Sequence, residues 1–222
     1  MTPATPQPSR WYLLRITMVA TLGGFLFGFD SGVISGAVGA LKEAFGASDI
    51  GSGWNVSSML LGCGAGALVA GRLSERLGRL TVMKWSAVFF VVSAWGSGVS
   101  DGSLEFVVYR VLGGLAVGAA SVICPAYVCE IAPAEIRGRL GSLQQMAIVL
   151  GLFVSFLSNY LLASWAGSAA GTAWGGFEAW RWMFWIEIGP AVFFWLGLFF
   201  IPESPRYLVR TGDLATARTV LD

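Results

Sequence analysis

Long apolar stretches alternate with short polar connections along the whole chain. Six stretches are predominantly hydrophobic, and glycine-bearing or charged turns separate them. They cover roughly residues 16–40, 55–70, 80–99, 104–126, 140–162 and 182–201. A helix needs about 20 apolar residues to cross the hydrocarbon core of a bilayer. The pattern therefore predicts an all-α membrane protein with six transmembrane helices.

Basic residues are concentrated on one side of this predicted arrangement. Lys42 and Arg181 are the two basic residues in the connections of one side. The connections and ends of the opposite side hold Arg10, Arg15, Arg72, Arg76, Arg79, Arg137, Arg139, Arg206, Arg210 and Arg218. Cytoplasmic loops of membrane proteins carry an excess of lysine and arginine. We therefore predict that both termini are cytoplasmic.

Composition supports a membrane protein and argues against several other classes. Of the 222 residues, 55% are hydrophobic and 12% are charged, against about 25% charged in soluble domains. The net charge of +1 gives no sign of nucleic-acid binding. Histidine is absent, and Cys63, Cys124 and Cys129 lie within or at the end of apolar stretches, which favours packing over disulfides or metal binding. We expect no metal, no cofactor and no enzymatic activity.

Three charged residues lie too deep inside the predicted spans to reach the membrane surface easily: Asp30, Arg110 and Glu187. Each costs roughly 2.5–3.5 kcal/mol at the centre of a membrane helix, and such residues are usually functional. With a rise of 1.5 Å per residue, all three are expected roughly 8–15 Å below the outer surface. A long arginine side chain could reach both acids from there. A static ion pair that only helps the helices to assemble is the alternative, but three charges at one depth favour a functional site.

Glycines recur at every fourth position in the first span, at Gly24, Gly28, Gly32 and Gly36. This spacing places them on one helix face, where they allow another helix to approach closely. Asp30 points to a different face of the same helix. The first span is therefore expected inside a bundle, with one packing face and one face that carries a charge.

Three connections on the arginine-rich side contain both arginine and carboxylate residues. They read "GRLSERLGRL" (71–80), "PAYVCEIAPAEIRGRL" (125–140) and "PESPRYLV" (202–209). Each alone is an ordinary charged turn, but together they can form networks that hold one arrangement of the helices and break in another. The candidate gating residues are Gly71, Arg72, Glu75, Arg76, Gly78, Arg79, Glu130, Arg137, Glu203 and Arg206.

The ordered set of motifs resembles that of the sugar porters of the major facilitator superfamily. The resemblance runs from about Arg15 to the last residue and includes "GFDSGVISGA", "GRLSERLGR", "YRVLGG", "PAYVCEIAP", "RGRL", "LQQMAIVLG", "WRWMF" and "PESPRYL". Two positions depart from the family pattern. Glu75 stands where aspartate or asparagine is more frequent. Leu152 stands where some members have a polar, sugar-contacting residue, so the resemblance does not indicate which sugar is transported.

The resemblance implies roles for individual residues. Asp30 matches the aspartate of proton-coupled members, Arg110 its arginine partner, and Glu187 a glutamate linked to coupling. Gln145, with Gln144 beside it, matches a glutamine that hydrogen-bonds sugar. Asp30 is then expected to carry a proton, and its protonation would release Arg110 and change the preferred arrangement of the bundle.

The resemblance also implies a division of the chain. Family members contain two six-helix halves with the substrate between them, and this chain corresponds to the N-terminal half. We expect a cytoplasmic tail at residues 1–15, a six-helix half-bundle at 16–201, and the truncated start of a cytoplasmic linker helix region at 202–222.

These expectations lead to one favoured function and two alternatives. The favoured function is the N-terminal half of a proton-coupled hexose or pentose symporter in a cell membrane, working by alternating access. The alternatives are a passive sugar facilitator or sensor, and a stand-alone six-span half that dimerises or regulates a transporter. The expected partners are a sugar, a proton, the lipid bilayer, and either a missing C-terminal half or a second copy, with no nucleic acid.

Overall fold

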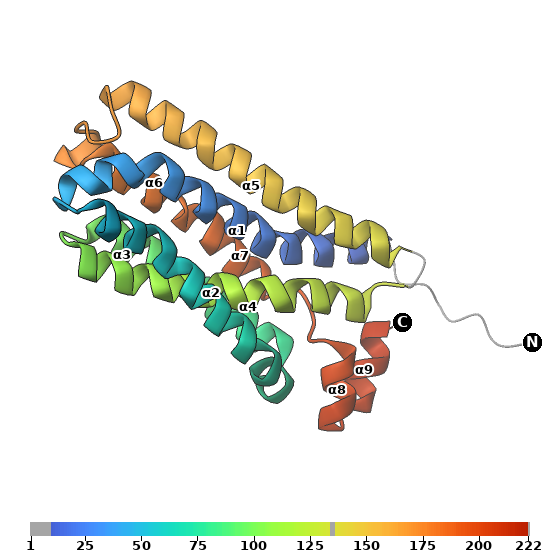
Figure 1. The fold of residues 1–222 in the computed structure, drawn as a ribbon. Helices are drawn as coiled ribbons and strands as arrows, with labels where there is room; N and C mark the ends of the chain where they lie inside the picture. The colour runs from blue at the N-terminus through green and yellow to red at the C-terminus, as the bar shows by residue number, and fades with distance from the viewer. Residues whose placement is uncertain (1–9, 134–135, 222) are drawn as a thin grey trace, which may run out of the picture.

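The computed structural model describes residues 10–133 and 136–221, and these residues form helices joined by short connections. Residues 1–9 of the expected tail and Asp222 lie outside the described residues. Figure 1 shows the order of the elements. They are α1 (Arg10–Ala44), α2 (Asp49–Leu77), α3 (Arg79–Val99), α4 (Ser103–Ile131), α5 (Arg137–Ala166), a 3₁₀ turn (Trp174–Gly176), α6 (Ala179–Ile186), α7 (Ile188–Gly197), α8 (Pro205–Thr211) and α9 (Leu214–Leu221).

Within the described ranges, five helices, α1 to α5, are long and apolar enough to cross a membrane. The expected sixth helix is divided into α6 and α7 at Glu187. Pro190 explains this break, because proline has no backbone N–H to bond the carbonyl of Ile186. The N–H of Glu187 also bonds the carbonyl of Phe184, only three residues back, at 3.1 Å, so the turn at this point is tighter than in a regular α-helix. The backbone is thus locally irregular where one of the three predicted charges is placed.

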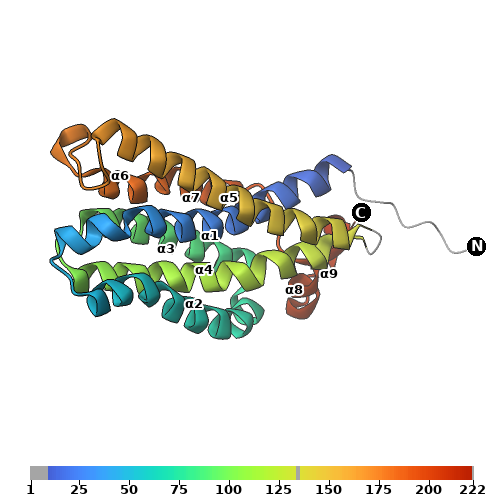
Figure 2. The same cartoon turned by 45° about the horizontal axis from the view of Figure 1, so that its top comes forward.

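Helices α1 and α4 form the centre of the bundle. Helix α5 packs along α1 on one side and α2 packs along α4 on the other, while α3 contacts α4, α6 and α7. Figures 1 and 2 show this arrangement from two directions. The beginning of α1 lies at the same end of the bundle as α8 and α9 (Figure 1), but which membrane side this end faces stays a prediction.

The glycine face of α1 packs directly against α5, which confirms the expected close approach. A Cβ atom at Gly28 would overlap the backbone carbonyl of Ile148, and one at Gly32 would overlap the hydroxyl of Ser155. The side-chain amide of Asn159 also donates to the carbonyl of Gly32, at 3.0 Å. The two helices are therefore joined by both contact and hydrogen bonding.

Candidate functional site

Asp30 and Arg110 form a buried ion pair between the two central helices. Asp30 is 2% exposed on α1 and Arg110 is 1% exposed on α4. Nη1 of Arg110 donates to Oδ1 of Asp30. The guanidinium also lies over the ring of Phe184 from α6, 5.5 Å from its centroid. A charged pair in such a dry environment attracts strongly, and removing either partner leaves the other charge uncompensated.

Glu187 lies beside this pair but outside hydrogen-bonding contact with it. Its side chain is 2% exposed and close enough to interact electrostatically with both Asp30 and Arg110. Within the described residues it forms no ion pair at 4.0 Å or less. The structure thus brings all three predicted charges together, with Arg110 bound to one of the two acids.

The pair leaves hydrogen-bonding groups unused. Oδ2 of Asp30 and Nε of Arg110 are buried and find no partner among the described residues. Ser93 from α3 is near the free carboxylate oxygen, next to Gly113, but its hydroxyl donates to the carbonyl of Tyr109 at 2.8 Å. Unpaired polar atoms in a buried site are costly, so both side chains keep hydrogen-bonding capacity that this arrangement leaves unused.

Gln144 and Gln145 line a hollow of about 240 Å³ between α1, α4 and α5. Gln145 is exposed, whereas Gln144 is 8% exposed and its Oε1 finds no partner within the described part of the chain. The remaining lining residues are Gly24, Phe27, Ser121, Pro125, Gly141 and Ile148. Both amides are therefore placed to donate to, or accept from, a polar molecule in this hollow.

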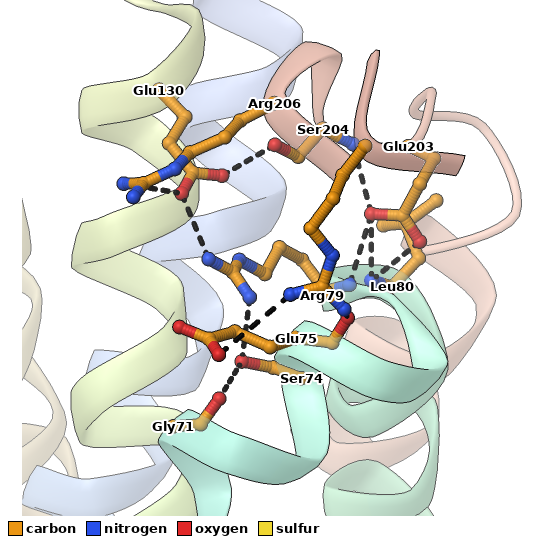
Figure 3. Close-up of polar contacts among 10 residues, drawn as sticks. Gly71, Ser74, Glu75, Arg79, Leu80, Glu130, Glu203, Ser204 and Arg206 are labelled. Atoms are coloured by element: carbon orange, nitrogen blue, oxygen red, sulfur yellow. Dashed lines mark hydrogen bonds and ion pairs between the residues drawn. The ribbon is translucent and has the colours of Figure 1, made fainter. Parts of the chain in front are cut away.

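A second polar cluster joins the ends of three elements near α8, shown in Figure 3. Nη2 of Arg79 donates to Oε1 of Glu130 at 3.0 Å, and Nη1 donates to the hydroxyl of Ser74 at 2.9 Å. The other carboxylate oxygen of Glu130 accepts from the hydroxyl of Ser204. Nη1 of the exposed Arg206 lies 3.9 Å from Glu130. Glu130 therefore links α4 to α3 and to the segment that begins α8.

Glu203 caps the first turn of α3. Its Oε1 accepts from the backbone N–H of Arg79 at 3.0 Å, and its two carboxylate oxygens share the N–H of Leu80. These are groups that a helix leaves unpaired at its start. Gly78 precedes them with a φ of +96° and no room for a Cβ atom beside Glu203. The glycine and the glutamate, 125 positions apart in the sequence, thus form one turn.

The other gating candidates lie at the rim of this cluster. Glu75 pairs with Arg210 at 3.7 Å, and the carbonyl of Gly71 accepts from the hydroxyl of Ser74 at 2.9 Å. Both Glu75 and Arg210 are about half exposed, so their pair adds little stability. The sequence did not predict this contact between Arg210 and Glu75.

Among the residues that the structure describes, three predicted arginines take no part in the ion pairs of the cluster. Arg72, Arg76 and Arg137 are exposed. The backbone carbonyl of Arg76 accepts from the hydroxyl of Tyr207 at 3.3 Å, and Nη2 of Arg137 donates to the carbonyl of Ala132 at 3.2 Å. The structure therefore brings Arg79, Glu130, Glu203 and Arg206 together and leaves these three outside.

Comparison with known proteins identifies the family. The family described as "Sugar (and other) transporter" matches residues 16–222, which is nearly the whole chain. The chain belongs to the sugar porters of the major facilitator superfamily. Members of this family are multi-pass proteins of the cell membrane, and the long apolar helices α1 to α5 agree with that location.

Relatives of this sugar porter include proteins named for sugar transport. It is 51% identical over 95% of its length to the "Glucose transport protein" of Synechocystis sp.. It is 38% identical over 95% of its length to the "D-xylose-proton symporter" of Escherichia coli (strain K12). The solved structure of the proton:xylose symporter XylE bound to 6-bromo-6-deoxy-D-glucose matches with a TM-score of 0.88 at 38% identity, over 95% of this chain and 49% of that one.

The sugar-porter chain spans about half the length of these relatives. It covers 45% of the Synechocystis protein and 47% of the Escherichia coli protein.

Proposed function

We propose that this chain is the N-terminal half of a proton-coupled sugar symporter that works by alternating access. The observation that carries the proposal is the buried pair of Asp30 and Arg110, with Glu187 beside it. Burying a titratable carboxylate between two membrane helices is energetically costly, and such residues usually mark proton or substrate pathways. The proton-symporter relatives at 36–38% identity support the same interpretation.

In the proposed mechanism, Asp30 carries the proton. While Asp30 is ionised, Arg110 holds α1 against α4 through the ion pair. Protonation removes the negative charge of Asp30, and the guanidinium is then left with Glu187 as the nearby acid. Because packed cores switch between discrete arrangements, this exchange of partners would favour a different packing of α1, α4 and α6.

The sugar is proposed to bind against the hollow lined by Gln144 and Gln145. Side-chain amides can both donate to and accept from hydroxyl groups, and Oε1 of Gln144 has an unused acceptor position. The relatives are named for glucose and D-xylose, so a hexose or a pentose is the expected substrate. A C-terminal half, or a second copy, would supply the opposite wall.

The cluster around Glu130 is proposed to hold the present arrangement at the cytoplasmic end. It joins α2, α3, α4 and the start of α8 through Arg79, Glu203 and Ser204. Opening at this end requires these contacts to separate. Both termini are cytoplasmic in this proposal, because the arginine-rich connections lie at this end.

The deciding experiment uses the natural protein that contains these 222 residues, in sealed vesicles with an imposed pH gradient. Asp30→Asn keeps the size and polarity of the side chain but removes its titratable charge, so gradient-driven sugar accumulation should fall at least tenfold while sugar exchange persists. Glu43→Gln is the matched control, because Glu43 is an exposed acid on the same helix.

Gln145→Ala should weaken sugar affinity and keep the proton dependence.

The alternatives predict different results in the same vesicles. A passive facilitator or sensor would show no effect of the pH gradient, even in the unmodified protein. If Asp30→Asn accumulated sugar as well as the unmodified protein, the carboxylate would be structural and proton coupling through Asp30 would be rejected.

A further inference from the structure

We propose that Met59 is a positioning residue for proton coupling, an inference that rests on the proposed function of Asp30 and Arg110. Met59 lies on α2 and is 4% exposed. Nη2 of Arg110 donates to its sulfur at 2.8 Å, while Nη1 of the same guanidinium donates to Asp30. Arg110 is therefore held between an acid on α1 and a thioether on α2.

The backbone fixes Met59 in this place. Helices α2 and α4 touch through glycines, and a Cβ atom at Gly114 would overlap the backbone carbonyl of Met59. One turn further along α2, a Cβ atom at Gly62 would overlap the carbonyl of Val111. Because the backbones touch, the Cα atom of Met59 is held close to α4, and its buried side chain lies within reach of Arg110.

The sulfur holds the arginine without adding a charge. Three charged groups face one another at this site: Asp30 from α1, Arg110 from α4 and Glu187 from the α6–α7 junction. Helices α2 and α3 contribute Met59 and Ser93, which are uncharged. A methionine sulfur is a weak, neutral acceptor, so it competes with Asp30 for the guanidinium less than a third carboxylate would.

The contact also limits how tightly Arg110 can bind Asp30. Arginine and carboxylate prefer a bidentate pair with two parallel hydrogen bonds. Here Nη2 is engaged by Met59, and Oδ2 of Asp30 has no partner in the described part of the chain. Nη2 has two N–H groups, so the thioether does not block a second bond to Asp30, but it turns Nη2 toward α2 and favours the one-bond pair that the structure shows.

Removing the sulfur of Met59 as an acceptor should make Asp30 harder to protonate. In Met59→Leu the side chain keeps its volume but loses the sulfur, so Nη2 can turn to Oδ2 and complete the bidentate pair. The carboxylate is then stabilised, and a lower pH is needed to protonate it. We expect the midpoint of the pH profile of sugar uptake to shift to more acidic pH by about 0.5–1 unit.

The test compares three variants of the natural protein at equal membrane levels. Met83→Leu is the matched control, because Met83 is buried in the apolar core of the same bundle and should leave the profile unchanged. Met59→Gln replaces the sulfur by an amide oxygen, and this variant should keep the unmodified profile. A second readout is infrared titration of the protonated Asp30 carboxyl band, which is assigned by its loss in Asp30→Asn and does not require transport.

The outcomes separate this proposal from the proposed function. An acid shift in Met59→Leu alone, by both readouts, supports the role of the sulfur. An unchanged profile in Met59→Leu, or equal shifts in Met59→Leu and Met59→Gln, would overturn it while proton coupling stands. Absence of gradient-driven uptake in the unmodified protein would instead reject the proposed function, and the infrared titration would still decide whether Met59 controls protonation of Asp30.

Discussion

At the scale of single residues, Arg181 shows how one side chain can join several connections. It lies at the end of the bundle opposite α8 and α9. Nη1 donates to the carbonyls of Gly98 and Ser100 at 3.0 and 3.1 Å, which are acceptors left free where α3 ends. Nη2 donates to Asp101 and Nε donates to Glu178, at 3.0 and 2.7 Å. Arg181 therefore ties the start of α6 to the α3–α4 connection.

Glu178 makes this contact sensitive to acid. Partial burial acts to raise the pKa of Glu178, but the hydrogen bond and the positive charge of Arg181 outweigh it and hold the pKa below the ordinary 4.5. A depressed carboxyl pKa contributes stability above its unfolded value, and this stability is lost as the pH falls through the folded value. At neutral pH, the melting temperature of the unmodified protein should therefore be slightly higher than that of Glu178→Gln.

This difference should begin to shrink as the pH falls below the ordinary value of 4.5, and it should disappear below the lowered pKa of the folded state, where both side chains are neutral. Thermal unfolding in detergent across this pH range measures it, and Glu43→Gln, which changes an exposed acid on α1, is the control. A difference between Glu178→Gln and the unmodified protein that persisted at low pH would mean that packing, and not charge, is responsible.

The residue scale also shows what a single sequence can reveal. Asp30, Arg110 and Glu187 were predictable because a charge within an apolar stretch is conspicuous. Met59 was not, because a methionine in an apolar helix resembles its neighbours and its contact with Arg110 depends on the packing of α2 against α4. Ser204 was missed for the same reason, since its contact with Glu130 joins distant parts of the chain.

At the scale of elements, the periodicity of glycine predicted a helix contact, and the structure supplies the partner. The four regularly spaced glycines of α1 lie against α5, and a second set lies where α2 meets α4, namely Gly62, Gly66, Gly114 and Gly118. The break between α6 and α7 was not predicted, although "GP" at 189–190 was visible in the sequence. Apolar length alone suggested one continuous span, because hydropathy does not register the missing N–H of a proline.

Two glycines of α1 provide a matched test of the close contact. Gly28→Ala would place a methyl group on the backbone carbonyl of Ile148, whereas a Cβ atom at Gly39 meets nothing within 4 Å. Overpacking of this kind typically costs about 1–3 kcal/mol, so Gly28→Ala should lower the melting temperature by several degrees. Gly39→Ala should leave it unchanged or raise it slightly, because alanine favours a helix over glycine by about 1 kcal/mol. Equal effects of the two substitutions would contradict the α1–α5 contact.

At the scale of the whole molecule, the helices differ sharply in how much of their surface is covered. The most apolar windows of α1 and α4 are 61% buried, whereas those of α2 and α5 are 28% and 22% buried. Exposed side chains on these two helices include Leu60, Leu68, Phe153 and Tyr160. Helices α2 and α5 therefore offer large apolar faces to lipid or to further protein, and we expect a C-terminal half to cover part of them.

The 222-residue chain by itself is therefore expected to insert into a membrane without concentrating sugar. The buried pair of Asp30 and Arg110 is complete within it, so a proton could still bind. The hollow beside Gln144 and Gln145, however, would lack an opposite wall, and alternating access requires two bodies that move against each other.

Purified chain in sealed vesicles with an inward proton gradient should thus show sugar uptake no higher than empty vesicles. If a C-terminal six-helix half forms that wall, supplying such a half as a separate chain should restore accumulation. Accumulation by the 222-residue chain alone would instead mean that a second copy forms the opposite wall, and cross-linking between copies through α2 and α5 would then locate that interface.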